Sequence, residues 1–301
     1  MSHTSKDRLD PMIHALFLRS GHDGVTARTA LFEQAIDGLW AFINRLREPD
    51  SEVLRFPPIM SRAHIEKHGY LHSFPHLLGC VSCLDGKEAD IRALVERRKS
   101  GSNWTDALAA SDLVLTPAAC YPVYPIAAER GNIPAGGLKF DIASYCFRRE
   151  ATYESDRLQA FRMREFVCIG NPEQASEFRA RWLSRATDIA NRLGLPHTVA
   201  PASDPFFGRV GKLAAMMQIE QALKFEMLIP VNSEEQPTAC MSFNCHREHF
   251  GEIWGLHSEN GETAHTACVA FGIDRLGLAI FATHGLDPKT WPPMVRDTLA
   301  M

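Results

Sequence analysis

The 301-residue sequence has little excess charge and no long apolar run. Its 32 basic and 36 acidic side chains give a formal net charge of −4. Sequence-independent binding of nucleic acid needs a cationic surface and is therefore not expected. No stretch of 18 or more apolar residues occurs, and residues 1–10 are polar, so neither a membrane helix nor a signal peptide is expected. The sequence predicts a cytoplasmic protein that does not bind membranes.

Cysteine is sparse as well, with eight residues in 301. That number is too low for a disulfide scaffold, so each thiol is a small core residue, a metal ligand or a nucleophile. Proline and glycine are scattered, and 45% of the residues are hydrophobic, which excludes a disordered chain and allows a sizeable core. Repeats and long linkers are absent. We therefore expect one domain over residues 1–301, in which residues 1–50 form a helical N-terminal segment that packs on the core.

Hydrophobic periodicity predicts an α+β fold. Helices are expected over residues 23–47, 86–99, 103–111, 171–193 and 272–284. The clearest is 171–193, where Asn171 is the N-cap, Pro172 takes the first helical position and Gly194 ends the helix. Thr26 or Asp23 is the expected cap of the first helix. Strands are expected over 138–149, 161–169, 225–231, 239–245, 252–257 and 266–271, and they should pair antiparallel because most follow one another without an intervening helix.

Two segments carry side chains suited to a nucleotide. The first is a predicted hairpin whose first strand ends at Glu150 and whose second strand begins at Phe161. The two-residue period of a strand places Arg148 and Glu150 on one face, and Phe161 and Glu165 on one face of the second strand. A guanidinium binds phosphate oxygens and an aromatic ring stacks on a nucleobase. Cross-strand salt bridges alone would explain the same pattern.

The second segment is the small-residue strand 266–272, which leads into a helix through Asp274 and Arg275. Arg275 falls in the first turn of that helix, where the helix dipole disfavours a cation. A bound phosphate would compensate for this placement. A salt bridge to Asp274 or another neighbour is the simpler alternative.

Together, the two segments resemble motifs 2 and 3 of the class II aminoacyl-tRNA synthetases. Pro57 and Pro58, which follow an apolar strand, resemble motif 1, the dimer-forming element of that family. The resemblance covers roughly residues 50–285. It implies a class II synthetase-like antiparallel sheet flanked by helices, with ATP and Mg²⁺ on its open face, and a homodimer. The nearest candidates for a Mg²⁺ carboxylate, Glu234 and Glu235, do not align with the family without a gap.

The same resemblance implies roles for four side chains. Arg148 would bind the ATP α-phosphate and the amino acid carboxylate, and Arg275 the γ-phosphate and the adenine side, which makes them the expected catalytic pair. Glu150 would hold the adenine amino group, with Phe161 stacked on the ring. Phe166 is the alternative stacking residue, but the two-residue period places it on the opposite face from Glu165.

Three zinc-competent residues lie in different parts of this implied pocket. Cys120 belongs to a proline-bounded loop, Glu165 to the second hairpin strand and Cys268 to the strand that enters motif 3. The resemblance to archaeal zinc-dependent seryl-tRNA synthetases implies that they hold Zn²⁺, with a fourth tetrahedral position open to the α-amino group of the substrate. Spacing alone would favour three unrelated buried residues.

Other potential ligands are weaker. Cys80 and Cys83 have the spacing of a zinc or redox pair, but no second pair accompanies them. One helix-like set of histidines recurs every four residues and comprises His64, His68, His72 and His76. Gly69 and Pro75 interrupt that helix, so these histidines are expected to be partly exposed and not to bind metal. Residues 244–249 are expected to line the pocket without binding zinc.

Seryl-tRNA synthetases carry a large N-terminal tRNA-binding domain, whereas only fifty to a hundred ordinary residues precede the core here. The chain therefore resembles the amino acid:[carrier protein] ligases more closely. That resemblance implies ATP-dependent activation of glycine or alanine and transfer to the phosphopantetheine thiol of a carrier protein, without tRNA. Residues 204–226 fit a helix peculiar to that subgroup or, equally, a core helix. A truncated seryl-tRNA synthetase-like enzyme acting on tRNA and a non-catalytic regulatory paralogue are the alternatives.

Overall fold

The computed structural model describes residues 10–22, 24–101, 103–150 and 156–301. Its central element is a seven-stranded sheet in the order β3-β7-β8-β12-β11-β10-β9. The strands are β3 (Glu52–Arg55), β7 (Leu138–Phe147), β8 (Ala160–Gly170), β9 (Thr198–Pro201), β10 (Lys224–Ile229), β11 (Thr238–Arg247) and β12 (His265–Gly272). Neighbouring strands pair antiparallel, as expected, except that β3 runs parallel to β7.

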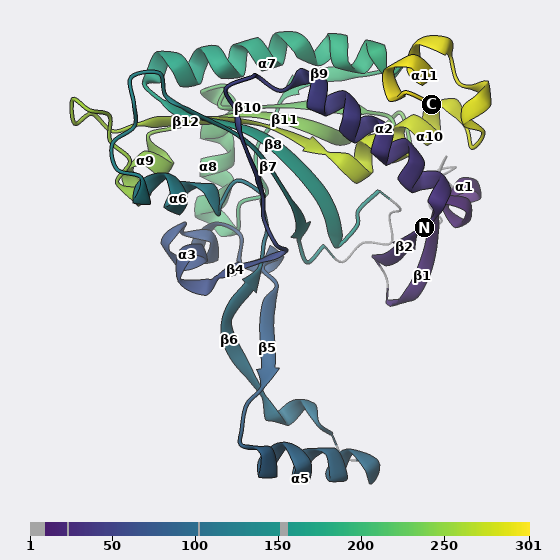
Figure 1. Cartoon of the computed structure of the whole chain (residues 1–301), viewed down its shortest axis with the longest axis vertical. Coiled ribbons are helices and arrows are strands. Elements are labelled where there is room, and N and C mark those ends of the chain that lie inside the picture. Colours follow the sequence, from purple (N-terminus) through teal and green to yellow (C-terminus); the bar gives the residue numbers. More distant parts are fainter. Residues whose placement is uncertain (1–9, 23, 102, 151–155) are drawn as a thin grey trace.

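Helices cover the sheet on one face and gather at one end of the other (Figure 1). The covering helices include α2 (Ala30–Leu46), α7 (Pro172–Arg192), α10 (Ile273–His284) and α11 (Pro293–Leu299). They enclose the main core, in which Trp182 is fully buried. A second core lies under α6 (Val123–Glu129) and α9 (His249–Trp254). None of the helices among the described residues has both the length and the apolar composition needed to span a lipid bilayer.

α7 forms as the sequence predicts. The Asn171 side chain accepts a hydrogen bond from the Gln174 amide at 2.8 Å, and the Gln174 side chain accepts one from the Asn171 amide at 2.8 Å. This reciprocal capping satisfies amides that the helix itself leaves free. Gly194 then ends the helix at a φ of +62°, a left-handed conformation that suits glycine.

The N-terminal region is not entirely helical, so that prediction is wrong in part. After α1 (Asp10–Leu16), a hairpin forms from β1 (Phe17–His22) and β2 (Val25–Arg28). The predicted cap Thr26 lies in β2, and α2 begins after Thr29, whose hydroxyl donates to the Ala15 carbonyl at 2.8 Å. Asp23 and residues 1–9 lie outside the described residues. The predicted helix extended into β2 because its cap was placed at Asp23 or Thr26, although the apolar stripe itself begins at Phe32 inside α2.

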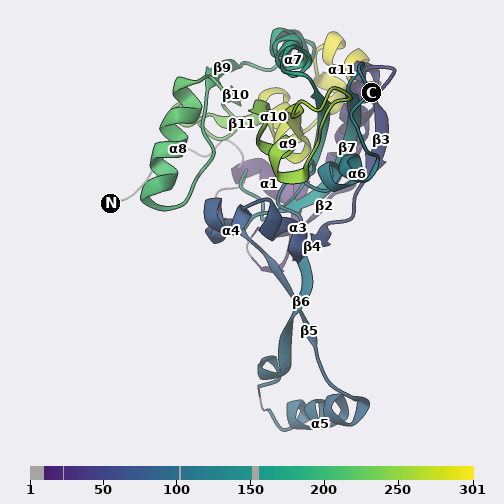
Figure 2. The same ribbon diagram turned by 90° about the vertical axis from the view of Figure 1, so that its left-hand side faces the viewer.

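A second sheet forms an arm that projects from the body (Figures 1 and 2). It consists of β4 (Ile59–Ser61), β6 (Leu108–Leu115) and β5 (Cys80–Leu84), and α5 (Glu88–Lys99) lies at its tip. The helix predicted at 103–111 is wrong, because only Thr105–Ala107 forms a 3-10 turn and Leu108 pairs across the strands with Leu84. Between arm and body lie α3 (Arg62–Lys67), α4 (Tyr70–Ser73) and the 3-10 turn Pro75–Leu77.

Two more predictions in the second half have mixed outcomes. The strand expected at 252–257 is instead α9, whose Gly251 lies so close to the Ala264 carbonyl that a Cβ atom would stand 2.1 Å from that oxygen. The segment before β10 contains α8 (Gly208–Glu220), of which only Gly211 is buried. α8 is therefore not a core helix, and Figure 2 shows it at the side of the sheet away from β3 and α11.

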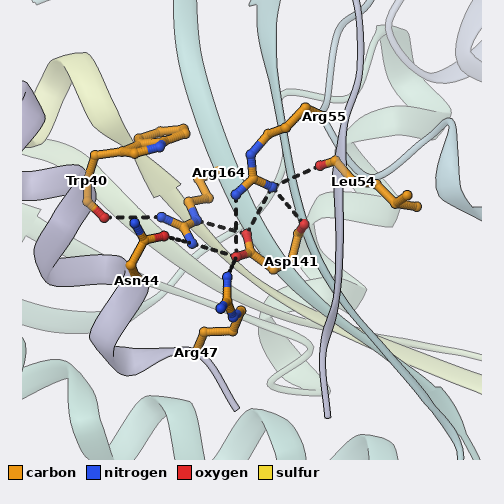
Figure 3. Close-up of polar contacts among 7 residues, drawn as sticks. All are labelled: Trp40, Asn44, Arg47, Leu54, Arg55, Asp141 and Arg164. Carbon is orange, nitrogen blue, oxygen red and sulfur yellow. Dashed lines mark hydrogen bonds and ion pairs between the residues drawn. The ribbon is translucent and has the colours of Figure 1, made fainter. Parts of the chain in front are cut away.

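The alternation along β8 sends neighbouring charged residues to opposite faces of the sheet. Arg164 pairs in register with Ala143 and Glu165 with Ile142. Arg164 points toward α2 and bonds Asp141, as Figure 3 shows. Glu165 points to the other face, next to Ala270 of β12 and diagonal to Cys268. One strand thus supplies a core ion pair and a residue of the cavity described next.

Candidate active site

A cavity of about 510 Å³ opens on the sheet face that carries Glu165. Its volume is in the range that encloses small organic ligands. The walls come from β8, β10, β11 and β12, from the segment that follows β7, from the loop before α6, and from the segment before α8. Every site residue expected from the sequence lines it, namely Cys120, Arg148, Glu150, Phe161, Glu165, Cys268 and Arg275.

At one side of the cavity, Arg148 lies beside an aromatic ring. Its guanidinium is 5.5 Å from the ring centroid of Phe161, and its Nε donates to the Pro117 carbonyl at 3.1 Å. Glu150 follows the end of β7 and pairs with Arg157 at 3.3 Å. Phe166, the alternative stacking residue, is buried on the opposite face. Phe161 therefore lies on the cavity face of the sheet, as the two-residue period predicted.

Arg275 enters the cavity from the first turn of α10. Its Nε donates to the Asp156 carbonyl at 3.2 Å and its Nη1 to the Ala239 carbonyl at 3.0 Å. The alternative of a salt bridge to Asp274 is wrong, because Asp274 bonds Arg28 at 2.8 Å and Arg162 at 2.7 Å instead. No other carboxylate among the described residues forms an ion pair with Arg275, so within this part of the chain two carbonyl dipoles hold its charge and leave it available to an anion.

Glu165, Cys120 and Cys268 meet on the floor of the cavity. Glu165 Oε1 accepts hydrogen bonds from the amides of Ala119 at 2.9 Å and Cys120 at 3.3 Å. The Cys120 thiol lies close enough to both Cys268 and Glu165 for each of them to raise its pKa. Cys268 Sγ in turn accepts from the Asn244 side chain at 3.3 Å. Three side chains far apart in sequence therefore lie together as one buried group.

Burial controls the protonation of this group. Burial, and then the neighbouring Cys268, raise the pKa of Glu165 to about 8, against hydrogen bonds from Cys120 and from two amides. The hydrogen bond from Cys120 lowers the pKa of Cys268 well below its usual value and raises that of Cys120. Among the described residues, no lysine or arginine forms an ion pair with Glu165. His246 favours the thiolate of Cys268, but among the described residues no lysine or arginine stabilises the ionised form of Glu165.

The donor set fits a zinc ion, although it is not preformed as a ligand shell. Within the part of the chain that the structure describes, no three His, Cys, Asp or Glu side chains stand in metal-binding geometry. Two sulfurs and one carboxylate are nevertheless the ligand types that Zn²⁺ prefers, and three protein ligands leave a position open for substrate. The buried carboxylate without a cation is the observation that favours this fit.

The other potential ligands have different environments. Cys80 and Cys83 are exposed on β5 in the arm and do not line the cavity. His246 and His249 line it, as expected, and His246 Nε2 lies 3.8 Å from Cys268 Sγ. His68 contradicts the expectation of exposure, since only 5% of it is accessible.

A second charged cluster in the cavity was not identified from the sequence. Lys224 of β10 pairs with Asp204 at 2.7 Å and Glu226 at 2.9 Å. Gln218 of α8 donates to the other oxygen of Asp204 at 2.8 Å, which ties α8 to the sheet edge. The alternation of Lys224 and Glu226 on one strand face was the available signal. The approach of Asp204 depends on a turn that no motif marks.

The sequence is similar to two curated proteins over nearly its whole length. It is 60% identical over 295 residues to amino acid--[acyl-carrier-protein] ligase 1 of Bradyrhizobium diazoefficiens, covering 98% of this chain and 90% of that protein. It is 56% identical to ligase 2 of the same organism, covering 98% and 88%. A type-2 serine--tRNA ligase of Methanopyrus kandleri is 30% identical over 62% of this chain and 37% of its own. No protein-family model matches the chain.

Solved structures show the same fold at low sequence identity. The M. kandleri seryl-tRNA synthetase, in complex with a tRNA from A. aeolicus, matches with a TM-score of 0.83 and 21% identity, over 97% of this chain and 59% of that one. The seryl-tRNA synthetase of Pyrococcus horikoshii, complexed with ATP, matches with a TM-score of 0.71 and 15% identity, over 100% and 64%. With the fold of the class II aminoacyl-tRNA synthetases and this sequence identity, the chain belongs to the family of amino acid--[acyl-carrier-protein] ligases.

Proposed function

We propose that this enzyme activates glycine or alanine with ATP and transfers the aminoacyl group to the phosphopantetheine thiol of a carrier protein. The names of the two similar B. diazoefficiens proteins support the reaction class and the carrier protein. The observation that carries the proposal is the convergence, in one cavity, of two guanidiniums, an aromatic ring and the buried group of Cys120, Glu165 and Cys268.

In this proposal, Arg148 and Arg275 act on ATP and the carboxylate of the amino acid. Arg148 orients the attacking carboxylate against the α-phosphate, and Arg275 holds the terminal phosphate, so that attack releases pyrophosphate. Phe161 stacks on the adenine, and Glu150 accepts a hydrogen bond from its amino group. Mg²⁺ would accompany the phosphates. Charge neutralisation and placement account for catalysis, and no side chain has to abstract a proton in this step.

We assign Cys120, Glu165 and Cys268 as ligands of Zn²⁺. Bound zinc would supply a positive charge and an open position for the neutral α-amino group of the substrate. A site that binds the amine in this way rejects carboxylic acids that lack an amino group, because nothing in such an acid replaces the contact between zinc and the amine. The two amides that bond Glu165 Oε1 hold the carboxylate in place.

α8 is the proposed docking surface for the carrier protein. Val210, Leu213 and Met216 are exposed by 82%, 58% and 66%, respectively, which is unusual for apolar residues on one helix. The helix also reaches the cavity through Gln218. A thiol delivered from this side enters the cavity next to the adenylate, attacks its carbonyl and releases AMP.

The homodimer stays a proposal based on motif 1. The edge strand β3 leaves Val53 exposed by 44%, and Ile59, directly after Pro57 and Pro58, is exposed by 37%. An unpaired strand edge with exposed apolar residues is suited to a second copy of the chain.

The test is amino-acid-dependent exchange of radiolabelled pyrophosphate into ATP, measured across the twenty amino acids. We expect exchange with glycine or alanine, labelling of a phosphopantetheinylated carrier, and no charging of total tRNA. Exchange followed by tRNA charging instead of carrier labelling would favour the truncated synthetase. Absence of exchange with every amino acid would contradict both enzyme readings and favour the regulatory paralogue.

A further inference from the structure

His68 lies in a buried contact that joins three separate segments. Its ring stacks on Tyr121, with centroids 4.4 Å apart and planes 22° apart. His68 Nε2 is 3.2 Å from the Tyr121 carbonyl oxygen, and Trp254 Nε1 is 3.4 Å from His68 Nδ1. The imidazole therefore connects the end of α3, the loop before α6 and the end of α9.

The chemistry of these partners determines the tautomer of His68. An indole N–H can only donate, so Nδ1 must be an acceptor without a proton. A carbonyl can only accept, so the single ring proton lies on Nε2 and is donated to Tyr121. Burial lowers the pKa of His68 to about 4, in agreement with a neutral ring. The result is a directed chain of hydrogen bonds from Trp254 through His68 to the Tyr121 backbone.

This chain connects the two thiol-bearing sides of the cavity floor. Tyr121 directly follows Cys120, so the accepting carbonyl belongs to the loop that carries one proposed zinc ligand. Trp254 belongs to α9, which follows β11, the strand whose Asn244 contacts Cys268. A second contact runs in parallel, because the Tyr124 and Phe250 rings stack 4.1 Å apart at 16°.

We propose that His68 is a positioning residue that holds the Cys120 loop against the α9 side of the cavity, and thereby sets the geometry in which the substrate amine is bound. This inference rests on the proposed function. His68 lies at the wall of the cavity, and in this proposal it acts through the Tyr121 carbonyl that it bonds. Its loss would displace Cys120 relative to Cys268, and a displacement of about 1 Å at a reacting centre can cost 10²-fold in rate.

The test compares His68→Phe with His68→Gln. Phenylalanine keeps the ring stack on Tyr121 and removes both hydrogen bonds, whereas a glutamine amide can accept from Trp254 and donate to Tyr121. The matched control is His64→Phe, one helical turn earlier. His64 is half-buried and touches the same Trp254 ring edge-on, at 5.1 Å and 87°.

For His68→Phe we expect a rise of at least tenfold in the KM for the amino acid in pyrophosphate exchange, with the KM for ATP changed by less than twofold. Zinc release to a chelator should also be at least tenfold faster, which is a readout independent of turnover. His68→Gln should restore both values to within about threefold of the wild type, and His64→Phe should leave them unchanged.

A purely structural role would lower the active fraction, and hence kcat, without moving the KM for the amino acid. That result, or a wild-type chelation rate in His68→Phe, would overturn the inference. If His68→Phe does not fold, Trp254→Phe removes one hydrogen bond of the chain, and an unchanged KM there would equally overturn it. Absence of zinc and exchange in the wild type would instead contradict the proposed function itself.

Discussion

Two buried carboxylates on adjacent strands have opposite surroundings. Asp141 on β7 faces the helices and is bonded by Arg164 at 2.5 and 2.8 Å, with Arg55 at 3.3 Å and Arg47 at 3.4 Å (Figure 3). Glu165 on β8 faces the cavity, has two amides as hydrogen-bond partners and lies near the Cys120 thiol. Both side chains are almost completely inaccessible to solvent.

Their pKa values shift in opposite directions for a physical reason. Burial by itself raises the pKa of Asp141, but the hydrogen bonds and charges of Arg164 and Arg55 outweigh it and lower the value. At Glu165 no cation opposes burial, and the pKa rises to about 8. The arginines keep the Asp141 carboxylate ionised inside the fold, whereas burial without such a partner favours the neutral form of Glu165. The comparison therefore separates a carboxylate that is ion-paired in the core from one that lines the cavity without an ion pair.

The largest effect should follow from removing the carboxylate at the cavity. Glu165→Gln should reduce pyrophosphate exchange by about 10³-fold, because the amide cannot replace an anionic zinc ligand. The free energy of unfolding of the metal-free protein should stay the same or rise, since a buried group without a cation becomes neutral. Exchange assays and urea unfolding measure the two quantities.

Cys268→Ala should likewise lower bound zinc and abolish adenylate formation while the fold stays intact. Retained zinc and retained exchange, in this variant or in Glu165→Gln, would refute the assignment.

The reverse pattern is expected for the helix-facing carboxylate. Asp141→Ala should lower the free energy of unfolding by about 3–5 kcal/mol, because it leaves the buried Arg164 and two neighbouring guanidiniums without their anion. Among the molecules that still fold, KM values for ATP and amino acid should match the wild type. Urea denaturation gives the stability change. A loss below about 1 kcal/mol would show that the arginines find other partners.

A smaller effect is expected from acid. Because the folded-state pKa of Asp141 is below its ordinary value of 3.8, its stabilising contribution is complete above that pH and is lost as the pH falls toward the folded-state value. One such group adds at most about 1.4 kcal/mol per pH unit to the slope. Asp141→Asn should have a shallower slope below pH 4 in urea unfolding measured against pH. Parallel slopes for the two proteins would contradict the assignment.

The smallest effect is expected at an exposed ion pair whose nitrogen–oxygen distance is similar to that between Arg164 and Asp141. Arg92 and Glu88 on α5 approach to 2.6 Å, but their side chains are 74% and 87% exposed. Solvent screening and side-chain entropy leave such a pair worth about 0.5 kcal/mol or less. Arg92→Ala should therefore change the unfolding free energy by no more than that. A loss comparable to that of Asp141→Ala would show that distance, and not burial, determines these energies.

Local features were predictable where the chain carries its own signal. The Asn171 cap and Gly194 end of α7 need only neighbouring residues, and the two-residue period placed Phe161 and Glu165 on one face without a structure. Predictions failed where tertiary pairing decided the element. Leu108 joins a strand because Leu84 lies opposite, and residues 252–254 belong to α9, which packs through Gly251 against the Ala264 carbonyl.

By itself, the sequence determined the fold class and, through strand alternation together with the resemblance to the class II synthetases, part of the cavity lining, because alternation and helix caps act over a few neighbouring positions. Only the tertiary structure decided which charges are compensated. The order β7-β8-β12 brings Cys268 diagonal to Glu165, while α2 and β3 bring Arg47 and Arg55 to Asp141. Electrostatic partners of a buried carboxylate come from segments distant in the chain, so their presence or absence depends on packing and not on local sequence.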